Sequence, residues 1–192
     1  MKKVIILGAS GNIARHVIDV LVLKEGINLT LFLRDARRLR NKGVSKYRII
    51  EGDVLDLRQL NEAIAGQDIV YANLSGELGA MAKNITRAMN NAGIKKLIFI
   101  CSIGMYESPL KPVLKPYREA ADVIEASGLE YTILRPAWFT NVDEVDYETT
   151  RKGEPERGSV ISQKSLAALI AKIIERPEDY VHENLGVNKP QA

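Results

Sequence analysis

The sequence has few of the residues that form covalent or metal cross-links. It contains one cysteine, Cys101, so an intramolecular disulfide is excluded, and its two histidines argue against a zinc site. We therefore expect no metal. Low cysteine usage suits a reducing compartment, and we expect a cytoplasmic protein. No apolar run approaches the ~18 residues of a membrane span, so we expect no membrane association.

The chain also lacks a strong charge of either sign. Its 27 Lys and Arg against 24 Asp and Glu give a net charge of +3. This balance does not indicate a nucleic-acid partner, and we expect none. With 192 residues, of which 46% are hydrophobic, the chain can fill one core. We predict a single domain over residues 1–192.

What the sequence does contain is an alternation of short apolar runs with longer helical patterns. The run Leu97–Cys101 is continuously apolar, which is typical of a parallel strand buried on both faces. Apolar residues recur with helical spacing over 13–21 and 166–174, and Ser162 is the expected N-cap of the second helix. This alternation predicts an α/β fold with a doubly wound, mostly parallel sheet and helices on both faces. We expect the strands at 4–7, 28–33, 47–51, 69–72, 96–101, 131–135 and 185–188.

Two segments do not fit the alternation. Residues 105–116 carry three prolines, and residues 136–160 are polar, charged and punctuated by glycine. Long irregular segments inside compact domains are usually functional loops. Both follow the expected carboxyl ends of strands, where open α/β sheets bind ligands. We predict that these two loops build a substrate region.

A glycine motif follows the first expected strand and begins the first expected helix. In Gly8-Ala9-Ser10-Gly11-Asn12-Ile13-Ala14, the glycines permit a tight turn and the close approach of a pyrophosphate. The start of the helix then presents free N–H groups to the anion. The motif predicts dinucleotide binding, and a plain structural turn is the alternative. The expected contacts are Gly8, Ser10, Gly11, Asn12 and Ile13.

The residue after the second expected strand distinguishes the two nicotinamide dinucleotides. A carboxylate there suits the ribose 2′-hydroxyl of NAD, whereas a cation suits the 2′-phosphate of NADP. This chain has Arg34, with Arg37 and Arg38 following. We expect NADP (NADPH) to be preferred, with NAD possible. The alternative is a solvated basic patch beside Asp35, which would cap a short helix.

Five landmarks together resemble a known group of proteins. They are Gly8-Ala9-Ser10-Gly11, Leu33-Arg34, Gly52-Asp53-Val54, Cys101-Ser102 and Leu134-Arg135-Pro136-Ala137. Their order resembles the short-chain dehydrogenase/reductase superfamily, and within it the atypical NAD(P)H-binding proteins grouped with NmrA and the flavin/biliverdin-IXβ reductases. The resemblance covers essentially the whole chain and implies a Rossmann fold.

The resemblance also implies roles along the cofactor. Asp53 and Val54 would form the adenine pocket, although Asp53 could be a simple turn residue. Residues 74–76 would pass beneath the ribose, and residues 136–137 would bond the carboxamide. Trp138 and Phe139 would offer an apolar wall to a flat acceptor, with core packing as the alternative. The implied cofactor-binding residues are Asp53, Val54, Leu74, Ser75, Gly76, Pro136, Ala137, Trp138 and Phe139.

The same resemblance implies Ser102 and Tyr117 as catalytic residues. The superfamily pattern Tyr-x-x-x-Lys has lost its lysine here, because Ala121 stands at that position. A tyrosine with an ordinary pKa of ~10 is a poor proton relay near neutral pH without a nearby cation. Hydride transfer can nonetheless proceed when an acceptor is merely held against the nicotinamide.

We therefore expect an NADPH-dependent oxidoreductase that reduces a small or flat acceptor, such as a flavin, a quinone or a carbonyl, by positioned hydride transfer. The alternative is a non-catalytic NmrA-like sensor that binds NAD(P) and a protein partner. Ala121 favours the sensor, whereas Trp138 and Phe139 favour the enzyme. An epimerase or dehydratase fits least, because those reactions need the Tyr-Lys pair.

Overall fold

An eight-stranded sheet forms the centre of the computed structural model, which describes residues 1–40 and 43–191. The strand order is β3-β2-β1-β4-β5-β6-β10-β8, and every pairing is parallel except that of β8 with β10. The strands are β1 (Lys2–Leu7), β2 (Ile27–Leu33), β3 (Arg48–Glu51), β4 (Ile69–Ala72), β5 (Lys96–Ile100), β6 (Glu130–Pro136), β8 (Glu148–Arg151) and β10 (Glu183–Asn188). The predicted doubly wound, mostly parallel sheet is confirmed.

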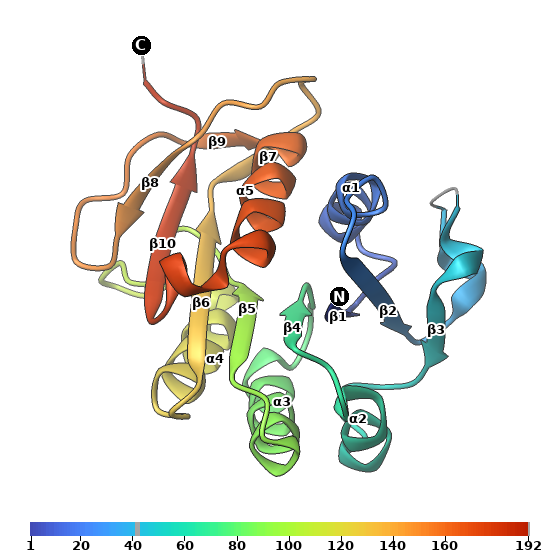
Figure 1. The fold of residues 1–192 in the computed structure, drawn as a ribbon. Helices are drawn as coiled ribbons and strands as arrows, with labels where there is room; N and C mark the ends of the chain where they lie inside the picture. Colours follow the sequence, from blue (N-terminus) through green and yellow to red (C-terminus); the bar gives the residue numbers. More distant parts are fainter. Residues whose placement is uncertain (41–42, 192) are drawn as a thin grey trace.

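Helices cover both faces of this sheet. Figure 1 shows α1 (Asn12–Leu21) and α5 (Gln163–Glu175) on one face, with α2 (Leu57–Ile64), α3 (Leu78–Ala92) and α4 (Lys115–Glu125) on the other. Short 3₁₀ turns lie at η1 (Ala36–Arg38), η2 (Val44–Lys46), η3 (Pro112–Leu114) and η4 (Pro177–Tyr180). Among the described residues, no helix is both long and apolar enough to cross a membrane.

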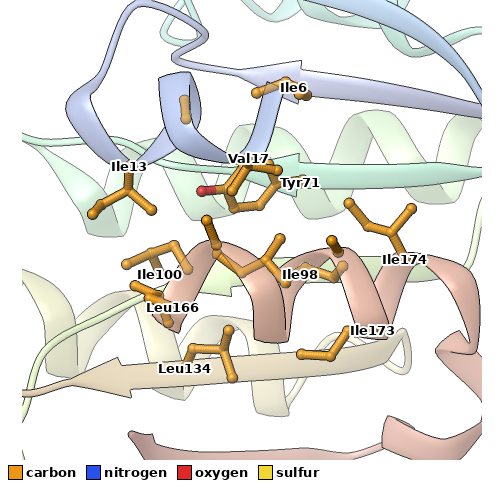
Figure 2. Close-up of a cluster of buried hydrophobic side chains, with 14 of the residues drawn as sticks. Ile6, Ile13, Val17, Tyr71, Ile98, Ile100, Leu134, Leu166, Ile173 and Ile174 are labelled. Carbon is orange, nitrogen blue, oxygen red and sulfur yellow. The ribbon is translucent and has the colours of Figure 1, made fainter. Parts of the chain in front are cut away.

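The strands β1, β2, β4, β5 and β6 contribute side chains to two apolar clusters, one on each face of the sheet. In β1, Val4 and Ile6 join the cluster under α1 and α5, while Ile5 and Leu7 join the cluster under α2, α3 and α4. Figure 2 shows part of the first cluster, with Ile6 beside Val17 of α1. Because successive side chains point to opposite faces, a strand buried on both sides must be apolar throughout.

Ser162 is the N-cap residue of α5, as the sequence predicted. Its hydroxyl accepts a hydrogen bond from the backbone N–H of Ser165 at 2.9 Å and so caps α5. The helix ends at Glu175, just before Pro177. Residues 105–114 form a loop that ends in the turn η3, and α4 begins at Lys115, so the last two residues of the expected loop 105–116 belong to the helix.

The segment 136–160 departs from its expected irregularity. It contains β8 and also β7 (Trp138–Thr140), which pairs in parallel with β9 (Val160–Ser162) as a small second sheet. β8 is an edge strand in which only Thr150 is buried, so it carries no apolar run. Its pairing with β10, far along the chain, is what makes it a strand.

Candidate functional site

The turn after β1 is packed tightly against the end of β4. Gly8 has a positive φ of 82°, and its N–H donates to the carbonyl oxygen of Phe32 at 2.9 Å. A β-carbon at Gly8 would lie 2.1 Å from the carbonyl oxygen of Asn73, and one at Gly11 would lie 2.4 Å from Nδ2 of Asn73. Gly8 therefore requires glycine, because the clash is with a backbone carbonyl at a positive φ, whereas a side chain at Gly11 would have to displace the side chain of Asn73. The sequence indicated the glycines but not their neighbour, Asn73.

This turn leads into α1 without a side-chain cap. Gly11 is the N-cap residue, and no side chain accepts a hydrogen bond from the first turn of α1 in the described structure. The N–H groups at this helix end are thus available to an anion, whose charge the helix dipole would stabilise. The observed turn fits a pyrophosphate.

A pocket of about 190 Å³ opens beside the turn, at the carboxyl ends of β1 to β4. Eight of its lining residues are ones that the sequence suggested: Gly8, Ser10, Gly11, Arg34, Asp53, Val54, Leu74 and Ser75. Of the other lining residues, Leu33, Asp35, Arg38 and Gly52 belong to the stretches quoted from the sequence but were not predicted as contacts, and the sequence missed Phe32, Leu55, Asn73 and Met81. Phe32 belongs to β2 and Met81 to α3, so no short motif after a strand indicated them.

Of the cofactor contacts predicted after β1 and β4, three lie outside the lining of this pocket. Asn12 is exposed at the start of α1, and Gly76 is exposed beyond Ser75. The side chain of Ile13 is buried in the cluster under α1 and α5. Ile13 could therefore reach a dinucleotide only through its backbone.

The arginines after β2 have different surroundings. Asp35 caps η1, and its carboxylate accepts hydrogen bonds from Arg37, at 3.0 Å from N, 2.9 Å from Nε and 3.1 Å from Nη2. These bonds hold the pKa of Asp35 below its ordinary value. Arg34 and Arg38 instead line the pocket, whereas Arg37 does not. Asp35 thus caps η1 through Arg37, while Arg34 and Arg38 line the pocket.

Asp53 combines the two roles that the sequence left open. Its Oδ1 accepts a hydrogen bond from the N–H of Leu55 at 2.9 Å, which is a turn role, and its side chain also lines the pocket. Nδ2 of Asn84 donates to the carbonyl oxygens of Val54 and Leu55 at 3.1 and 3.0 Å. This turn is therefore fixed to α3.

A second pocket, of about 460 Å³, lies at the carboxyl ends of β5 and β6. It brings together Ser102, Tyr117, Pro136, Ala137, Trp138 and Phe139. Trp138 is 77% exposed and Phe139 45%, so core packing is wrong for both side chains. Six further lining residues come from the two loops that the sequence predicted as a substrate region: Glu107, Lys111, Val113, Leu114, Gly158 and Ser159. Cys101, Ile103 and Gly104 also line the pocket and were not predicted to do so.

On α4, Ala121 stands four residues after Tyr117, where the superfamily pattern has a lysine, so no cation lies at that position. Ala121 is fully buried in the cluster under α2, α3 and α4, so a lysine there would place an ammonium group in an apolar core. Arg118 stacks over the ring of Tyr106 at 4.7 Å and pairs with Asp122 at 3.0 Å. The described residues around Tyr117 in the pocket include one cation, Lys111, which lies 3.9 Å from Glu107.

Cys101 is unsuited to act as a nucleophile. Burial raises the pKa of its thiol, and Sγ donates weakly to the carbonyl oxygen of Tyr117 at 3.6 Å. Within residues 1–40 and 43–191, no group of His, Cys, Asp and Glu side chains could hold a metal ion.

Together the two pockets lie along the carboxyl edge of the sheet, over the neighbouring strands β3, β2, β1, β4, β5 and β6. The direction of winding reverses between β1 and β4, which is the switch point at which open α/β sheets bind dinucleotides. Fold and site thus define a dinucleotide-binding α/β protein. A family model described as NAD(P)H-binding matches residues 8–177, and the chain belongs to this family.

Individual relatives agree with this assignment. Protein YmjC of Escherichia coli K12 is 54% identical over 39 residues, 20% of this chain and 65% of that protein, so the match spans slightly less than two thirds of the relative. A solved Rossmann-fold NAD(P)-binding family protein from Shigella flexneri is 50% identical, with a TM-score of 0.92 over 100% of this chain and 95% of its own. The resemblance drawn from the sequence is confirmed at this level.

Two more distant structures share the fold. A short-chain dehydrogenase/reductase from Veillonella parvula DSM 2008, solved in complex with NADP, is 24% identical, with a TM-score of 0.88 over 98% of this chain and 95% of its own. ChuY, an anaerobillin reductase from Escherichia coli O157:H7, is 16% identical, with a TM-score of 0.84 over 100% of this chain and 98% of its own.

Proposed function

We propose that the protein is an NADPH-dependent reductase of a small, flat acceptor such as a flavin or a quinone, or of a small carbonyl. The observation that carries this proposal is the exposure of Trp138 and Phe139 on a pocket at the same carboxyl edge of the sheet as the dinucleotide turn. Exposed aromatic side chains are costly unless they meet a ligand or a partner. The similarity of fold to an anaerobillin reductase supports a flat acceptor.

The charges after β2 support NADPH over NADH. Arg34 and Arg38 line the pocket and offer guanidinium groups to a 2′-phosphate. The carboxylate of Asp35, which could otherwise accept a bond from a ribose 2′-hydroxyl, is already bound by Arg37. The NADP complex of the Veillonella parvula protein supports the same preference.

When bound, NADPH supplies a hydride, and the acceptor takes up that hydride together with a proton from solvent. The residues of this chain would bind and orient the cofactor and the acceptor. The turn 8–11 and the start of α1 would hold the pyrophosphate, and the backbone of 136–137 would hold the carboxamide. Trp138 would stack on the acceptor, while Tyr117 and Ser102 would donate hydrogen bonds to it. Proximity supplies most of the acceleration in such a site.

The test is steady-state NADPH oxidation against a panel of flavins, quinones and small carbonyls. The proposal predicts turnover with at least one flat acceptor and a lower KM for NADPH than for NADH. Clear NADPH binding without any turnover would contradict it and favour an NAD(P) sensor with a protein partner. The buried Ala121 favours that second function, because it removes the cation that activates the tyrosine. We place either activity in the cytoplasm, which suits the unpaired Cys101.

A further inference from the structure

One carboxylate joins three separate segments beside the second pocket. Glu156 lies in the segment 152–159, between β8 and β9. Its Oε1 forms an ion pair with Nη1 of Arg135, at the end of β6. Its Oε2 accepts a hydrogen bond from the backbone N–H of Gly104, in the turn after β5, at 2.8 Å. Both oxygens of the carboxylate are therefore occupied by donors.

Arg135 is a rigid anchor for this carboxylate. Its side chain is only 2% exposed, and its Nε donates to Oδ1 of Asn184 on β10 at 2.9 Å. Nδ2 of Asn184 in turn donates to the hydroxyl of Tyr106 at 2.8 Å and to Oε1 of Glu125 at 2.9 Å. The guanidinium also lies over the ring of Tyr106, 5.4 Å from its centroid. A buried guanidinium held on several sides cannot follow a moving loop.

The segments that Glu156 joins are walls of the second pocket. Gly104, in the turn after β5, and Ser159, in the segment 152–159, both line this pocket. The carbonyl oxygen of Ser159 accepts a hydrogen bond from the N–H of Trp138 at 3.0 Å. Glu156 therefore fastens the segment that holds Trp138 to the turn after β5, alongside the hydrogen bond from the N–H of Ile103 to the carbonyl oxygen of Pro136 at 3.1 Å.

We propose that Glu156 is a positioning residue for the acceptor, because it fixes the spacing between the wall of Gly104 and the wall of Trp138. This rests on the proposed function, in which an acceptor lies between those walls. A fixed spacing presents the acceptor in one orientation, on which positioned hydride transfer depends. The residue acts through Gly104 and Ser159 and does not touch the acceptor itself.

The test compares Glu156→Gln with Glu154→Gln. An amide has one acceptor oxygen and an NH₂ group, so glutamine at 156 can satisfy only one of its two donors. Glu154 lies on the same segment, where it accepts from the N–H of Arg151 at 2.9 Å, and is the matched control. Glu156→Asp keeps both carboxylate oxygens and is the rescue variant.

Two measurements decide the proposal. Hydrogen exchange at the amide of Gly104 should accelerate about tenfold or more in Glu156→Gln, with no change in the control and partial recovery in Glu156→Asp. The KM for the acceptor should rise about tenfold with a smaller change in kcat, while the Kd for NADPH stays within about twofold. A purely structural role would lower stability without this split between KM and kcat.

The failure of the proposal is distinct from the failure of the proposed function. If the wild-type protein reduces no acceptor of the panel, the proposed function fails, and the dissociation constants of FMN and menadione from quenching of Trp138, the only tryptophan, replace the KM. Unchanged exchange at Gly104 and unchanged acceptor affinity in Glu156→Gln would overturn the positioning role in either case. If that variant does not fold, Glu156→Asp decides it: the proposal predicts a smaller change of both readouts in the same direction, and wild-type values of both would overturn the positioning role.

Discussion

At the scale of single residues, the neighbours of a charged group decide what it can bind. Arg34, Arg37 and Arg38 look equivalent in the sequence, yet Arg37 is bound to Asp35 while the other two line the first pocket. A guanidinium already paired with a carboxylate has little to offer a phosphate. The sequence could place a basic cluster here but not divide the roles within it.

Replacing Arg34 with alanine should remove most of the preference for NADPH over NADH. A charge-assisted hydrogen bond contributes ~1.5–3 kcal/mol, so the ratio of the two dissociation constants should fall by roughly ten- to a hundredfold. Isothermal calorimetry with both cofactors measures this ratio. Arg37→Ala is the matched control and should leave it nearly unchanged. Equal weakening for both cofactors in Arg34→Ala would show that Arg34 does not meet the 2′-phosphate.

Substitutions of the two glycines of the turn should have different effects. Gly11→Val should abolish dinucleotide binding in a folded protein, because the new side chain meets only the movable end of Asn73 and then fills the space of the pyrophosphate. Gly8→Ala should instead lower the free energy of unfolding, by about 1–3 kcal/mol, because its β-carbon meets a backbone carbonyl at a positive φ. Thermal melts and calorimetry separate the two. Retained affinity in Gly11→Val would exclude this turn as the phosphate site.

Tyr117 and Trp138 distinguish two modes of catalysis. If position alone drives hydride transfer, Tyr117→Phe should cost less than about tenfold in kcat, against the ~10²–10⁴-fold that removal of a general acid costs. Trp138→Ala should cost more, because it removes the exposed wall that orients the acceptor. Steady-state kinetics on the preferred acceptor measure both. A large loss in Tyr117→Phe would contradict positioning.

At the scale of elements, the sequence patterns predicted the strands that are buried on both faces of the sheet. The parallel strands β1, β2, β4, β5 and β6 contain long apolar stretches because helices cover both of their sides. The strands β7, β8 and β9 are three or four residues long, and each has exposed side chains. Their strand character comes from pairing with distant partners, such as Val187 opposite Thr149. No local pattern could reveal it.

In the candidate site too, the sequence predicted the residues that stand in local motifs and not those that depend on contacts between distant segments. The glycine turn, Arg34 and Asp53 could be found because each follows a strand in a short motif. Glu156 could not, because its partners Arg135 and Gly104 lie 21 and 52 residues away and meet it only in the fold. A single glutamate in a charged loop looks like any solvated side chain.

The N-cap of α5 offers a prediction at this scale. Ser162→Ala should lower the free energy of unfolding by about 1–2 kcal/mol, because the N–H of Ser165 and the carbonyl oxygen of Glu144 both lose a partner. Chemical denaturation measures the change. The Kd for NADPH should stay the same, since α5 lines neither ligand pocket. No loss of stability would mean that Ser162 does not hold the helix.

At the scale of the whole molecule, the first pocket spans the reversal between β1 and β4, and the second lies beyond it, at β5 and β6. The first pocket has the cations and the glycine turn, and the second has the exposed aromatic wall. A dinucleotide lying across the carboxyl edge would reach from one to the other, with its adenosine end near Arg34 and its nicotinamide near Pro136 and Ala137. That orientation is the central claim, because it alone brings the hydride to the acceptor pocket.

A crystal structure of the complex with NADP tests this claim most directly. We predict a 2′-phosphate in contact with Arg34, a pyrophosphate on the turn 8–11 at the start of α1, and a nicotinamide whose carboxamide bonds the backbone of 136–137 beside Trp138. A dinucleotide bound away from the turn would contradict the account. So would a reversed dinucleotide, with its nicotinamide at Arg34 and Asp53.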